Sequence, residues 1–236
     1  MSEVSPPENV PDEGELILID KPLTWTSFDV VKKLKWACKF KKIGHAGTLD
    51  PLATGLLILC TGKKTKQIDT YQAQEKEYEG TLVLGKTTPS VDLETEFDRE
   101  FPVDHISEDA LTEAARQLTG VLQQLPPMYS AVRVDGERLY KKARRGETIE
   151  IKPREVTVKS FEITTDDFPN IHFRIVCSKG TYIRSLVRDF GQILGSGAYL
   201  SALRRTRIGD FSVSDSVPME EFIHTKRVEL NLPNQL

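Results

Sequence analysis

The order in which strand-like and helix-like segments follow one another constrains the fold of this chain more than any other feature. Apolar or alternating segments, the pattern of strands, are interspersed with capped helical patterns. The expected strands are 15–20, 77–84, 130–134, 155–163, 171–177 and 208–213, and the expected helices are 26–38, 107–118, 137–145, 180–194 and 198–204. Because the two kinds do not alternate in a β-α-β rhythm, we expect an α+β protein rather than a doubly wound parallel sheet.

Length and composition indicate a globular intracellular protein. The 236 residues, 39% of them hydrophobic and 28% charged, are enough for one large domain or two small ones with a buried core. Three cysteines without CxxC spacing predict reduced, buried thiols rather than disulfides. Residues 1–13 are acidic and proline-rich, unlike a signal peptide, and predict a disordered tail. The apolar runs are too short to cross a membrane, so we expect a cytoplasmic protein.

The charges are segregated along the chain although the net charge is only -3. Six lysines and no acid lie between Val30 and Leu49, and five cations lie between Arg138 and Arg145. A third cluster contains Lys179, Arg184, Arg188, Arg204, Arg205 and Arg207. Nine acids gather between Asp92 and Glu113. Each basic cluster by itself is compatible with an ordinary solvated surface, but the three together predict a basic face for a polyanion such as a nucleic acid.

Residues 44–55 carry the strongest candidate for catalysis. They read Gly-His-Ala-Gly-Thr-Leu-Asp-Pro-Leu-Ala-Thr-Gly, which places Asp50 between glycine-bearing turns and after Lys41, Lys42 and His45. Glycines let a backbone approach a bulky substrate closely, and nearby cations attract an anion. The alternative is structural, because Asp50-Pro51 is also the pattern of a helix N-cap followed by proline at the first helical position.

Tyr78 and Arg184 are two further candidates, and each has a structural alternative. Tyr78 lies on a predicted strand, where a tyrosine commonly packs against a neighbouring strand. Arg184, at the start of a predicted helix, is able to hold a carboxylate through two hydrogen bonds or to form a surface ion pair. The chain has no Walker, GxGxxG or GxSxG pattern and no histidine spacing for a metal. We therefore expect chemistry without a metal or a dinucleotide cofactor.

Several segments in a fixed order resemble the bacterial TruB-type tRNA pseudouridine synthases, from about Gly14 to Phe211. The segments are Asp20-Lys-Pro with Thr26-Ser27, Lys42 to Gly55, Lys76-Glu-Tyr78, Gln124 to Ala131, Tyr140 with Ala143-Arg144 and Gly146, Gly180-Thr-Tyr-Ile-Arg184, and Leu203 to Phe211. The long Gly-His-x-Gly-x-Leu-Asp-Pro-x-Ala-x-Gly segment makes this resemblance specific.

The resemblance implies a fold and an activity. The expected fold is that of pseudouridine synthases, with a central, mixed but mostly antiparallel sheet flanked by helices and an active-site cleft across the sheet. The catalytic domain is expected over residues 14–225, with a thumb-like RNA-clasping insertion over about 123–150. Residues 226–236 are expected to form a C-terminal tail in place of a PUA-type RNA-binding domain. The implied reaction converts the T-loop uridine of tRNA (position 55) to pseudouridine after flipping the base out, and needs no cofactor.

The resemblance also implies roles for individual residues. Asp50 is expected to attack either the sugar C1′ or the uracil C6, with Arg184 paired to it and Tyr78 stacked on the flipped base. The residues expected to bind the substrate or its RNA backbone are His45, Lys21, Tyr182, Leu203, Lys42 and Arg144. The implied partner is the T-arm of tRNA, bound by a monomer without a membrane or an obligatory protein partner.

Two other functions are compatible with parts of the sequence. An RNA chaperone would remodel tRNA without chemistry, and it would need none of Asp50, Tyr78 and Arg184, all of which are present. A guide-RNA-dependent relative would need protein partners, and the short C-terminal region disfavours it.

Overall fold

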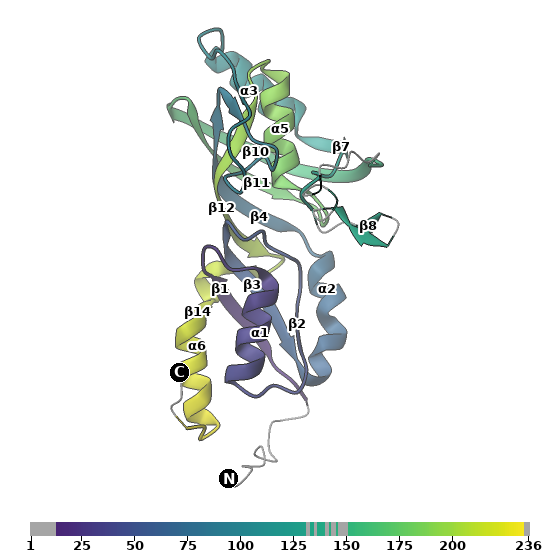
Figure 1. Cartoon of the computed structure of the whole chain (residues 1–236), viewed down its shortest axis with the longest axis vertical. Helices are drawn as coiled ribbons and strands as arrows, with labels where there is room; N and C mark the ends of the chain where they lie inside the picture. The colour runs from purple at the N-terminus through teal and green to yellow at the C-terminus, as the bar shows by residue number, and fades with distance from the viewer. Residues whose placement is uncertain are drawn as a thin grey trace. The chain divides into compact units, whose positions relative to one another are not determined.

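The computed structural model describes residues 13–130, 133–134, 136–139, 142, 145 and 151–233. Residues 1–12 of the tail predicted over 1–13, much of the thumb-like insertion and Arg144 lie outside the described residues. The chain forms two compact units. Unit 1 comprises Met1–Gln74 and Arg204–Leu236, and unit 2 comprises Glu75–Leu203. Both units contain helices and strands in irregular order (Figure 1), which confirms the predicted α+β class.

Unit 1 is built around the long central strand β3. Its elements are β1 (Leu16–Lys21), α1 (Ser27–Ala37), β2 (Ile43–His45), β3 (Ala53–Thr61), η1 (Gly62–Gln67), α2 (Ile68–Ala73), β13 (Phe211–Ser212), η2 (Val213–Asp215), β14 (Val217–Pro218) and α6 (Met219–Glu229). Strand β1 pairs antiparallel with β3 and parallel with β14, and β2 also pairs antiparallel with β3. The strand predicted over residues 15–20 is therefore confirmed.

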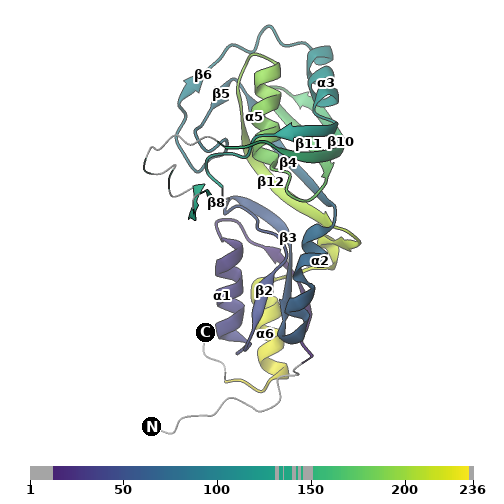
Figure 2. The ribbon, with the colours of Figure 1, turned by 90° about the vertical axis from the view of Figure 1, so that its right-hand side faces the viewer.

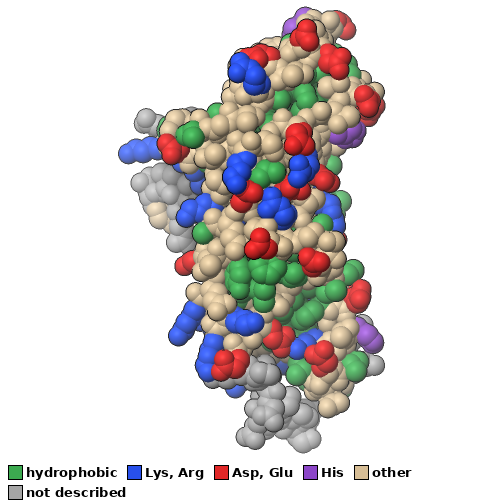
Figure 3. All heavy atoms as spheres, turned by 180° about the vertical axis from the view of Figure 1, so that it is seen from behind, with side chains coloured by type: hydrophobic (Ala, Val, Ile, Leu, Met, Phe, Trp, Pro, Cys, Tyr) green, Lys and Arg blue, Asp and Glu red, His purple; other side chains and the backbone are tan. Residues whose placement is uncertain are grey.

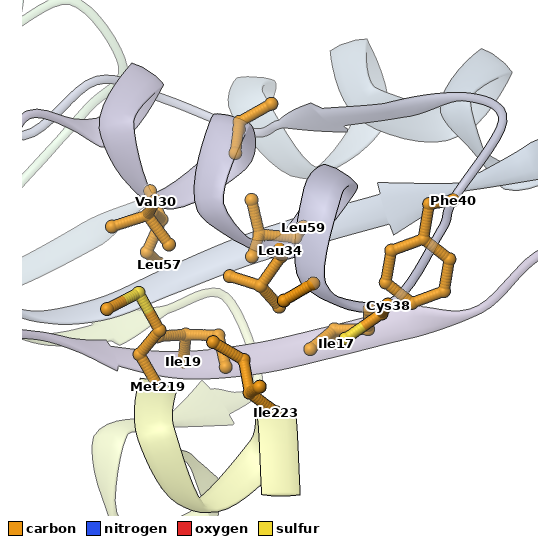
Figure 4. Packing of buried hydrophobic residues seen from close by; sticks show 12 residues of the cluster. Ile17, Ile19, Val30, Leu34, Cys38, Phe40, Leu57, Leu59, Met219 and Ile223 are labelled. Carbon is orange, nitrogen blue, oxygen red and sulfur yellow. The ribbon is translucent and has the colours of Figure 1, made fainter. Parts of the chain in front are cut away.

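Strand β3 carries a continuous apolar run, Leu56 to Cys60, because both of its faces are covered there. Leu57 and Leu59 point into a core shared with α1 and α6 (Figure 4). Leu56 and Ile58 point into a second cluster, against which Ile68 of α2 packs. Helices α1 and α2 thus lie on opposite faces of this sheet (Figure 2). A strand buried on both faces reads as a continuous apolar run rather than as an alternating one.

Helix α1 begins and ends close to where its sequence predicts. The Thr26 hydroxyl accepts a hydrogen bond from the Asp29 backbone N–H at 3.0 Å, and the Asp29 carboxylate accepts one from the Thr26 N–H at 3.1 Å. This reciprocal capping box satisfies two backbone donors that the first turn leaves open. The inner face of the helix then packs on the sheet through Val30 and Leu34. The prediction of a helix over residues 26–38 is therefore confirmed.

In the part of unit 2 that the structure describes, helices α3 and α5 pack on an antiparallel sheet. Its elements are β4 (Lys76–Leu84), β5 (Lys86–Thr87), β6 (Arg99–Glu100), α3 (Glu108–Gln117), β7 (Gly120–Gln124), β8 (Arg133–Val134), β9 (Glu137–Arg138), β10 (Arg154–Asp167), β11 (Asn170–Cys177), α5 (Ile183–Ile193) and the first part of β12 (Ala198–Ile208). The order β4-β11-β10-β7 is antiparallel throughout. Phe161 of β10 packs on Phe173 of β11 and on Phe190 of α5, with ring centroids 6.1 and 5.7 Å apart.

Two predicted elements are wrong, and both were judged from local patterns. Residues 198–204 form part of strand β12, not a helix. The stretch is rich in the helix formers Ala, Leu and Arg, but pairing in the sheet overrides propensity. Asp50-Pro51 does not begin a helix, because residues 51–52 form a turn and β3 starts at Ala53. Asp50 is therefore not a helix cap.

The C-terminal part of unit 1 and the region after Gly136 also differ from expectation. Glu137 and Arg138 form strand β9, so the helix predicted over residues 137–145 does not start at Glu137. Helix α6 was not predicted, and it continues past residue 225, where a tail was expected. Its Met219 and Ile223 fill the core in Figure 4. Among the described residues, no helix combines the length and the apolar character needed to span a membrane.

Candidate active site

Unit 1 holds Asp50 in a short loop between β2 and β3. The loop closes through backbone hydrogen bonds from Ala46 N–H to the Ile58 carbonyl at 2.8 Å and from Ala53 N–H to the Asp50 carbonyl at 3.1 Å. The buried hydroxyl of Ser27, in the first turn of α1, accepts a hydrogen bond from Leu49 N–H at 2.8 Å. The loop is therefore fixed at both ends and anchored to helix α1, and Asp50 itself is half-buried.

The glycines around Asp50 mainly serve contacts within the protein. A Cβ on Gly55 would lie 2.3 Å from the Arg205 carbonyl oxygen, and the φ of Gly55 is +101°. A Cβ on Gly44 would lie 2.8 Å from the Ile68 side chain. Gly55 needs glycine because the backbone of β12 passes there, whereas at Gly44 only the end of the Ile68 side chain would have to shift. Glycine at position 55 is thus explained by packing rather than by room for a substrate.

Two buried cations support the Asp50 loop from inside unit 1. Lys21 is 0% exposed, and its ammonium donates to the carbonyl oxygens of Pro22, Trp25 and Pro51 at 2.9, 2.5 and 3.3 Å. Arg205 is 1% exposed. Its Nε donates to the Leu56 carbonyl at 2.8 Å and its Nη2 to the Gly47 carbonyl at 3.2 Å, on either side of Asp50. Buried charges of this kind are retained only when hydrogen bonds satisfy them.

The position of Lys21 changes its expected role. Burial lowers the pKa of Lys21 to about 8, against the attraction of Asp50, which raises it, while Arg205 lowers it further. An enclosed ammonium shared by three carbonyls does not fit the expected contact with an RNA phosphate. Lys21 instead links the chain after β1 to the residue that follows Asp50, and it places a positive charge near the Asp50 carboxylate.

His45, at the end of β2, is held in its neutral form. Burial and the Arg205 charge lower its pKa, while a hydrogen bond with the Gly47 backbone opposes them. Its Nδ1 is buried without a hydrogen-bond partner among the described residues. A neutral imidazole beside the Asp50 loop is suited to donate or accept one hydrogen bond, but it is a poor electrostatic partner for phosphate. Lys42, which precedes the same strand, is exposed and suits such a contact.

Unit 2 contributes Arg184, which lies in the first turn of α5 and is 3% exposed. Its Nε lies 3.6 Å from the Asp92 carboxylate, which is also buried. Its Nη1 and Nη2 donate to the carbonyl oxygens of Ser90 and Tyr129 at 3.0 and 2.8 Å. The guanidinium is therefore fixed by two segments of unit 2, the loop of residues 90–92 and the segment at Tyr129. The expected pairing of Arg184 with Asp50 involves the other unit and stays a prediction.

The loop that presents Asp92 is strained. Val91 has a φ of +63°, which is unusual for a β-branched residue. It is held there by a hydrogen bond from Leu200 N–H to its carbonyl, and Thr88 Oγ1 donates to the Asp92 carbonyl at 2.6 Å. Strain of this kind persists only where surrounding contacts enforce it. Asp92 was not among the predicted site residues, because in the sequence it is one acid among nine in a polar stretch.

Tyr78 and Leu203 are placed on neighbouring strands of unit 2. Tyr78 on β4 lies opposite Ile175 of β11 and is 8% exposed. Leu203, the last residue of unit 2, lies on β12 and is 9% exposed. Both side chains are thus nearly buried, as apolar walls of a pocket for a base would be.

Tyr182 joins the start of α5 to the strand that leads into the thumb-like insertion. Its backbone N–H donates to Gln124 Oε1 at 2.7 Å, and Gln124 Nε2 donates back to the Tyr182 carbonyl at 3.1 Å. The guanidinium of Arg154 lies over its ring at 4.7 Å. Tyr182 therefore fixes β7 against α5, and Arg154 covers one face of its ring.

The third basic cluster of the sequence is largely engaged within the protein. Arg204 pairs with Asp20 at 2.7 Å, Arg188 pairs with Asp189 at 2.8 Å, and Arg184 and Arg205 are buried. Arg184 and Arg205 are therefore not available to phosphates, whereas Arg204 and Arg188 remain partly exposed. Figure 3, which views the molecule from behind Figure 1, likewise shows Lys and Arg side chains interspersed with Asp and Glu. Within the described part of the chain, no group of acidic, His or Cys side chains is arranged to hold a metal ion.

Two consecutive segments of the chain match models of one protein family. Residues 35–183 match the TruB family pseudouridylate synthase (N terminal domain), and residues 184–230 match the tRNA pseudouridylate synthase B C-terminal domain. The second match includes helix α6.

Curated relatives agree over almost their full length. The tRNA pseudouridine synthase B of Flavobacterium johnsoniae is 54% identical over 217 residues, covering 89% of this chain and 95% of the relative. That of Chloroherpeton thalassium is 50% identical over 216 residues, covering 89% and 90%.

Solved structures share the fold. A chain in a crystal structure of a Cbf5-Nop10-Gar1 complex superposes with a TM-score of 0.71 at 29% identity, covering 94% of this chain and 58% of that one. A chain in a structure of an H/ACA RNP bound to a substrate RNA containing 2′-deoxyuridine gives a TM-score of 0.68 at 25% identity, covering 94% and 57%. The expected pseudouridine synthase fold is therefore confirmed, while this chain spans just over half the length of those structures.

Proposed function

The chain belongs to the TruB family of pseudouridylate synthases, and from this premise we propose that it isomerises the T-loop uridine of tRNA to pseudouridine. The proposal rests on one observation: the chain is 50–54% identical to tRNA pseudouridine synthases B of two bacteria, over almost their full length. In this isomerisation the N1–C1′ bond breaks and a C5–C1′ bond forms. The C5 hydrogen leaves as a proton, and N1 gains one, so no cofactor is consumed.

We propose Asp50 as the carboxylate that acts on the uridine. Its loop is anchored to α1 by Ser27, and the buried cations Lys21 and Arg205 support it from inside unit 1. An ionised carboxylate needs nearby positive charge or hydrogen bonds when a substrate displaces water around it. Lys21, whose charge acts on Asp50, supplies such support from a buried position.

We assign Arg184 and Tyr78 to the same reaction. Asp92 and two carbonyls hold the Arg184 guanidinium within unit 2, which supports a role as a fixed cation rather than a mobile surface charge. The nearly buried Tyr78 ring suits stacking on an extruded base, which recovers part of the lost stacking energy. Exposed Lys42 and the half-buried His45 would contact the backbone of the flipped nucleotide.

The RNA-chaperone alternative predicts binding without chemistry. It explains an RNA-binding surface, but it leaves the buried support of Asp50 and the strained Asp92 loop without a purpose. We therefore favour the enzyme, acting in the cytoplasm as a monomer on the T-arm. Sedimentation of the purified chain with and without tRNA tests the monomer.

The decisive test is incubation with an unmodified tRNA transcript followed by mapping of pseudouridine. We expect conversion at the T-loop uridine, and no product in a matched transcript that carries cytidine there. If the wild-type chain binds the transcript but makes no pseudouridine, the proposed enzyme is wrong and the chaperone remains. Conversion at other uridines with the T-loop uridine untouched would refute the assigned substrate.

A further inference from the structure

Helix α1 presents two large aromatic side chains to solvent. Phe28 and Trp36 are 68% and 59% exposed, although Val30, Leu34 and Ala37 on the other side of the same helix are buried in the core. Single exposed apolar residues are common, but two largely exposed aromatic rings on one 11-residue helix are unusual enough to suggest a binding surface. The stability of unit 1 gives no reason for these rings to be where they are.

Trp36 forms one wall of an open groove along α1, which we call the tryptophan groove. Its volume is ≈ 440 Å³, and it is lined by Thr24, Trp25, Asp29, Lys32, Lys33 and Trp36. Positions 29, 32, 33 and 36 fall on one side of a helix because they are three or four residues apart. Trp25 comes from the segment before the helix and packs partly against the core, so one wall of the groove is rigid. The volume lies in the usual range of small-ligand sites, about 300–1,000 Å³.

The charge around the tryptophan groove is positive. Lysines lie along α1 and the segment after it, namely Lys32, Lys33, Lys35, Lys39, Lys41 and Lys42, and none of them forms an ion pair within the described part of the chain. The Lys39 ammonium lies over the Trp36 ring at 5.3 Å. The acid in the groove, Asp29, accepts hydrogen bonds from the backbone and hydroxyl of Thr26. A molecule bound in the groove therefore contacts aromatic rings bordered by several cations. The single carboxylate there is already hydrogen-bonded to Thr26.

The tryptophan groove and the Asp50 loop belong to the same unit and are joined by direct contacts. The Lys21 ammonium binds the carbonyl of Trp25, in the groove, and that of Pro51, next to Asp50. Ser27 Oγ, in the first turn of α1, accepts from Leu49 N–H on the other side of Asp50. The groove therefore begins near the Asp50 loop and follows α1 away from it, for up to about 16 Å along an 11-residue helix.

We propose that the tryptophan groove binds an unpaired nucleotide of the substrate RNA next to the target uridine. Its base stacks on the tryptophan rings, and Lys32 and Lys33 contact the flanking phosphates. Aromatic faces combined with a cationic border are what unpaired RNA requires, because each base has a face to stack and each linkage has a negative charge. A protein partner for this groove would need an acidic surface, and nothing else in unit 1 points to one. The inference rests on the proposed function, since it takes RNA as the substrate.

The chain offers a direct readout of this groove. It contains two tryptophans, Trp25 and Trp36, and both line the groove. Tryptophan emission of the whole protein therefore reports on the groove. Titration with a tRNA transcript that carries cytidine at the target position, which blocks chemistry, is expected to quench this emission. A duplex RNA of the same length, which has no unpaired nucleotide to insert, is expected to leave it largely unchanged.

Variants test the contribution of the groove to binding. Trp36→Ala is expected to raise the Kd for the cytidine transcript about 5- to 150-fold, the range for losing one stacked base, and Trp36→Phe is expected to restore most of the affinity. Because Trp36 is largely exposed, both variants should fold, which circular dichroism checks. Phe97→Ala is the matched control, since Phe97 is also half-exposed beneath a lysine, Lys86 at 5.1 Å, but lies in the acidic stretch.

The possible outcomes separate the groove from the enzyme. If the RNA quenches the emission and Trp36→Ala binds it more weakly, the groove is supported as an RNA site. This holds even if the wild-type chain makes no pseudouridine, because that result would refute only the reaction. Unchanged emission and an unchanged Kd in Trp36→Ala overturn the groove as an RNA site even if pseudouridine forms, and leave it to a protein partner. An equal loss of affinity in Phe97→Ala would also overturn it, because the effect would then be unspecific.

Discussion

Arg205 provides the most informative test of how the Asp50 loop is held. Its guanidinium donates to the Leu56 and Gly47 carbonyls, which lie on either side of Asp50. Hydrogen bonds to a charged group contribute about 1.5–3 kcal/mol each, so removing both in Arg205→Met costs roughly 3–6 kcal/mol. Removing a buried charge recovers part of its desolvation cost. We therefore expect a net loss of about 2–4 kcal/mol in the free energy of unfolding, and a smaller loss in Arg205→Lys.

The same substitution is expected to separate catalysis from binding. Since Arg205 is 1% exposed, it is not placed to contact a phosphate, and the Kd for tRNA should stay within about twofold. The turnover rate should fall about 10²-fold, because a loop displaced by about 1 Å misplaces the carboxylate. Urea unfolding, filter binding and single-turnover kinetics measure the three quantities. Arg207→Lys is the matched control, since its partly exposed guanidinium donates to the Gly209 carbonyl, in the turn after β12.

The reasoning fails if Arg205→Met loses tRNA binding while its turnover at saturating tRNA is unchanged. That result would make Arg205 an RNA contact rather than an internal support. An unchanged free energy of unfolding would equally refute the magnitude derived from its two hydrogen bonds.

Three further predictions concern buried charges and a glycine. Burial lowers the pKa of Lys21 to about 8 from 10.5, so the unfolded chain binds more protons than the folded chain between these two pH values. The free energy of unfolding of the wild type, relative to that of Lys21→Met, should therefore rise with pH in this range by up to roughly 3 kcal/mol. Urea unfolding at several pH values measures this, and a difference that does not change with pH contradicts it. Gly55→Ala should lower the melting temperature clearly more than Gly120→Ala. Both glycines have a positive φ, but only at Gly55 would the added Cβ collide with backbone atoms. Equal melting temperatures of the two variants would disprove the packing role of Gly55. Asp92→Asn should lower the free energy of unfolding by about 3 kcal/mol, because it removes the carboxylate that pairs with the buried charge of Arg184. Its tRNA affinity in filter binding should stay unchanged. A stable variant with weakened tRNA binding would argue against an internal ion pair.

The parts of the fold that were predictable are those in which local chemistry and tertiary structure agree. The caps at Thr26 and Ser107 are visible in sequence, because a capping side chain bonds its own helix. The strand at Tyr78 alternates as expected of a sheet with one buried face. Where a segment is defined by distant partners, local reading fails: β12 has helix-forming residues, and Asp50-Pro51 has the pattern of a cap that is not formed.

The sequence singles out the residues that are expected to meet the substrate, but not the residues that hold them in place. Asp50, Tyr78 and Arg184 are recognisable through their motifs. Asp92 and Arg205 are not, since the sequence shows only an acid among acids and an arginine among arginines. Their burial follows from the folding of distant segments around them, which no spacing along the chain encodes.

The most direct test of the central claim is a single-turnover measurement of tritium release from tRNA labelled at C5 of uridine, comparing the wild type with Asp50→Asn. Because pseudouridine formation expels the C5 hydrogen, release reports the chemical step alone. We expect wild-type release and none above background from Asp50→Asn, although the variant still binds tRNA, since phosphate contacts dominate affinity. Asp69→Asn, which changes an exposed acid on helix α2 of the same unit, should release tritium at the wild-type rate. Release at the wild-type rate by Asp50→Asn would contradict the account.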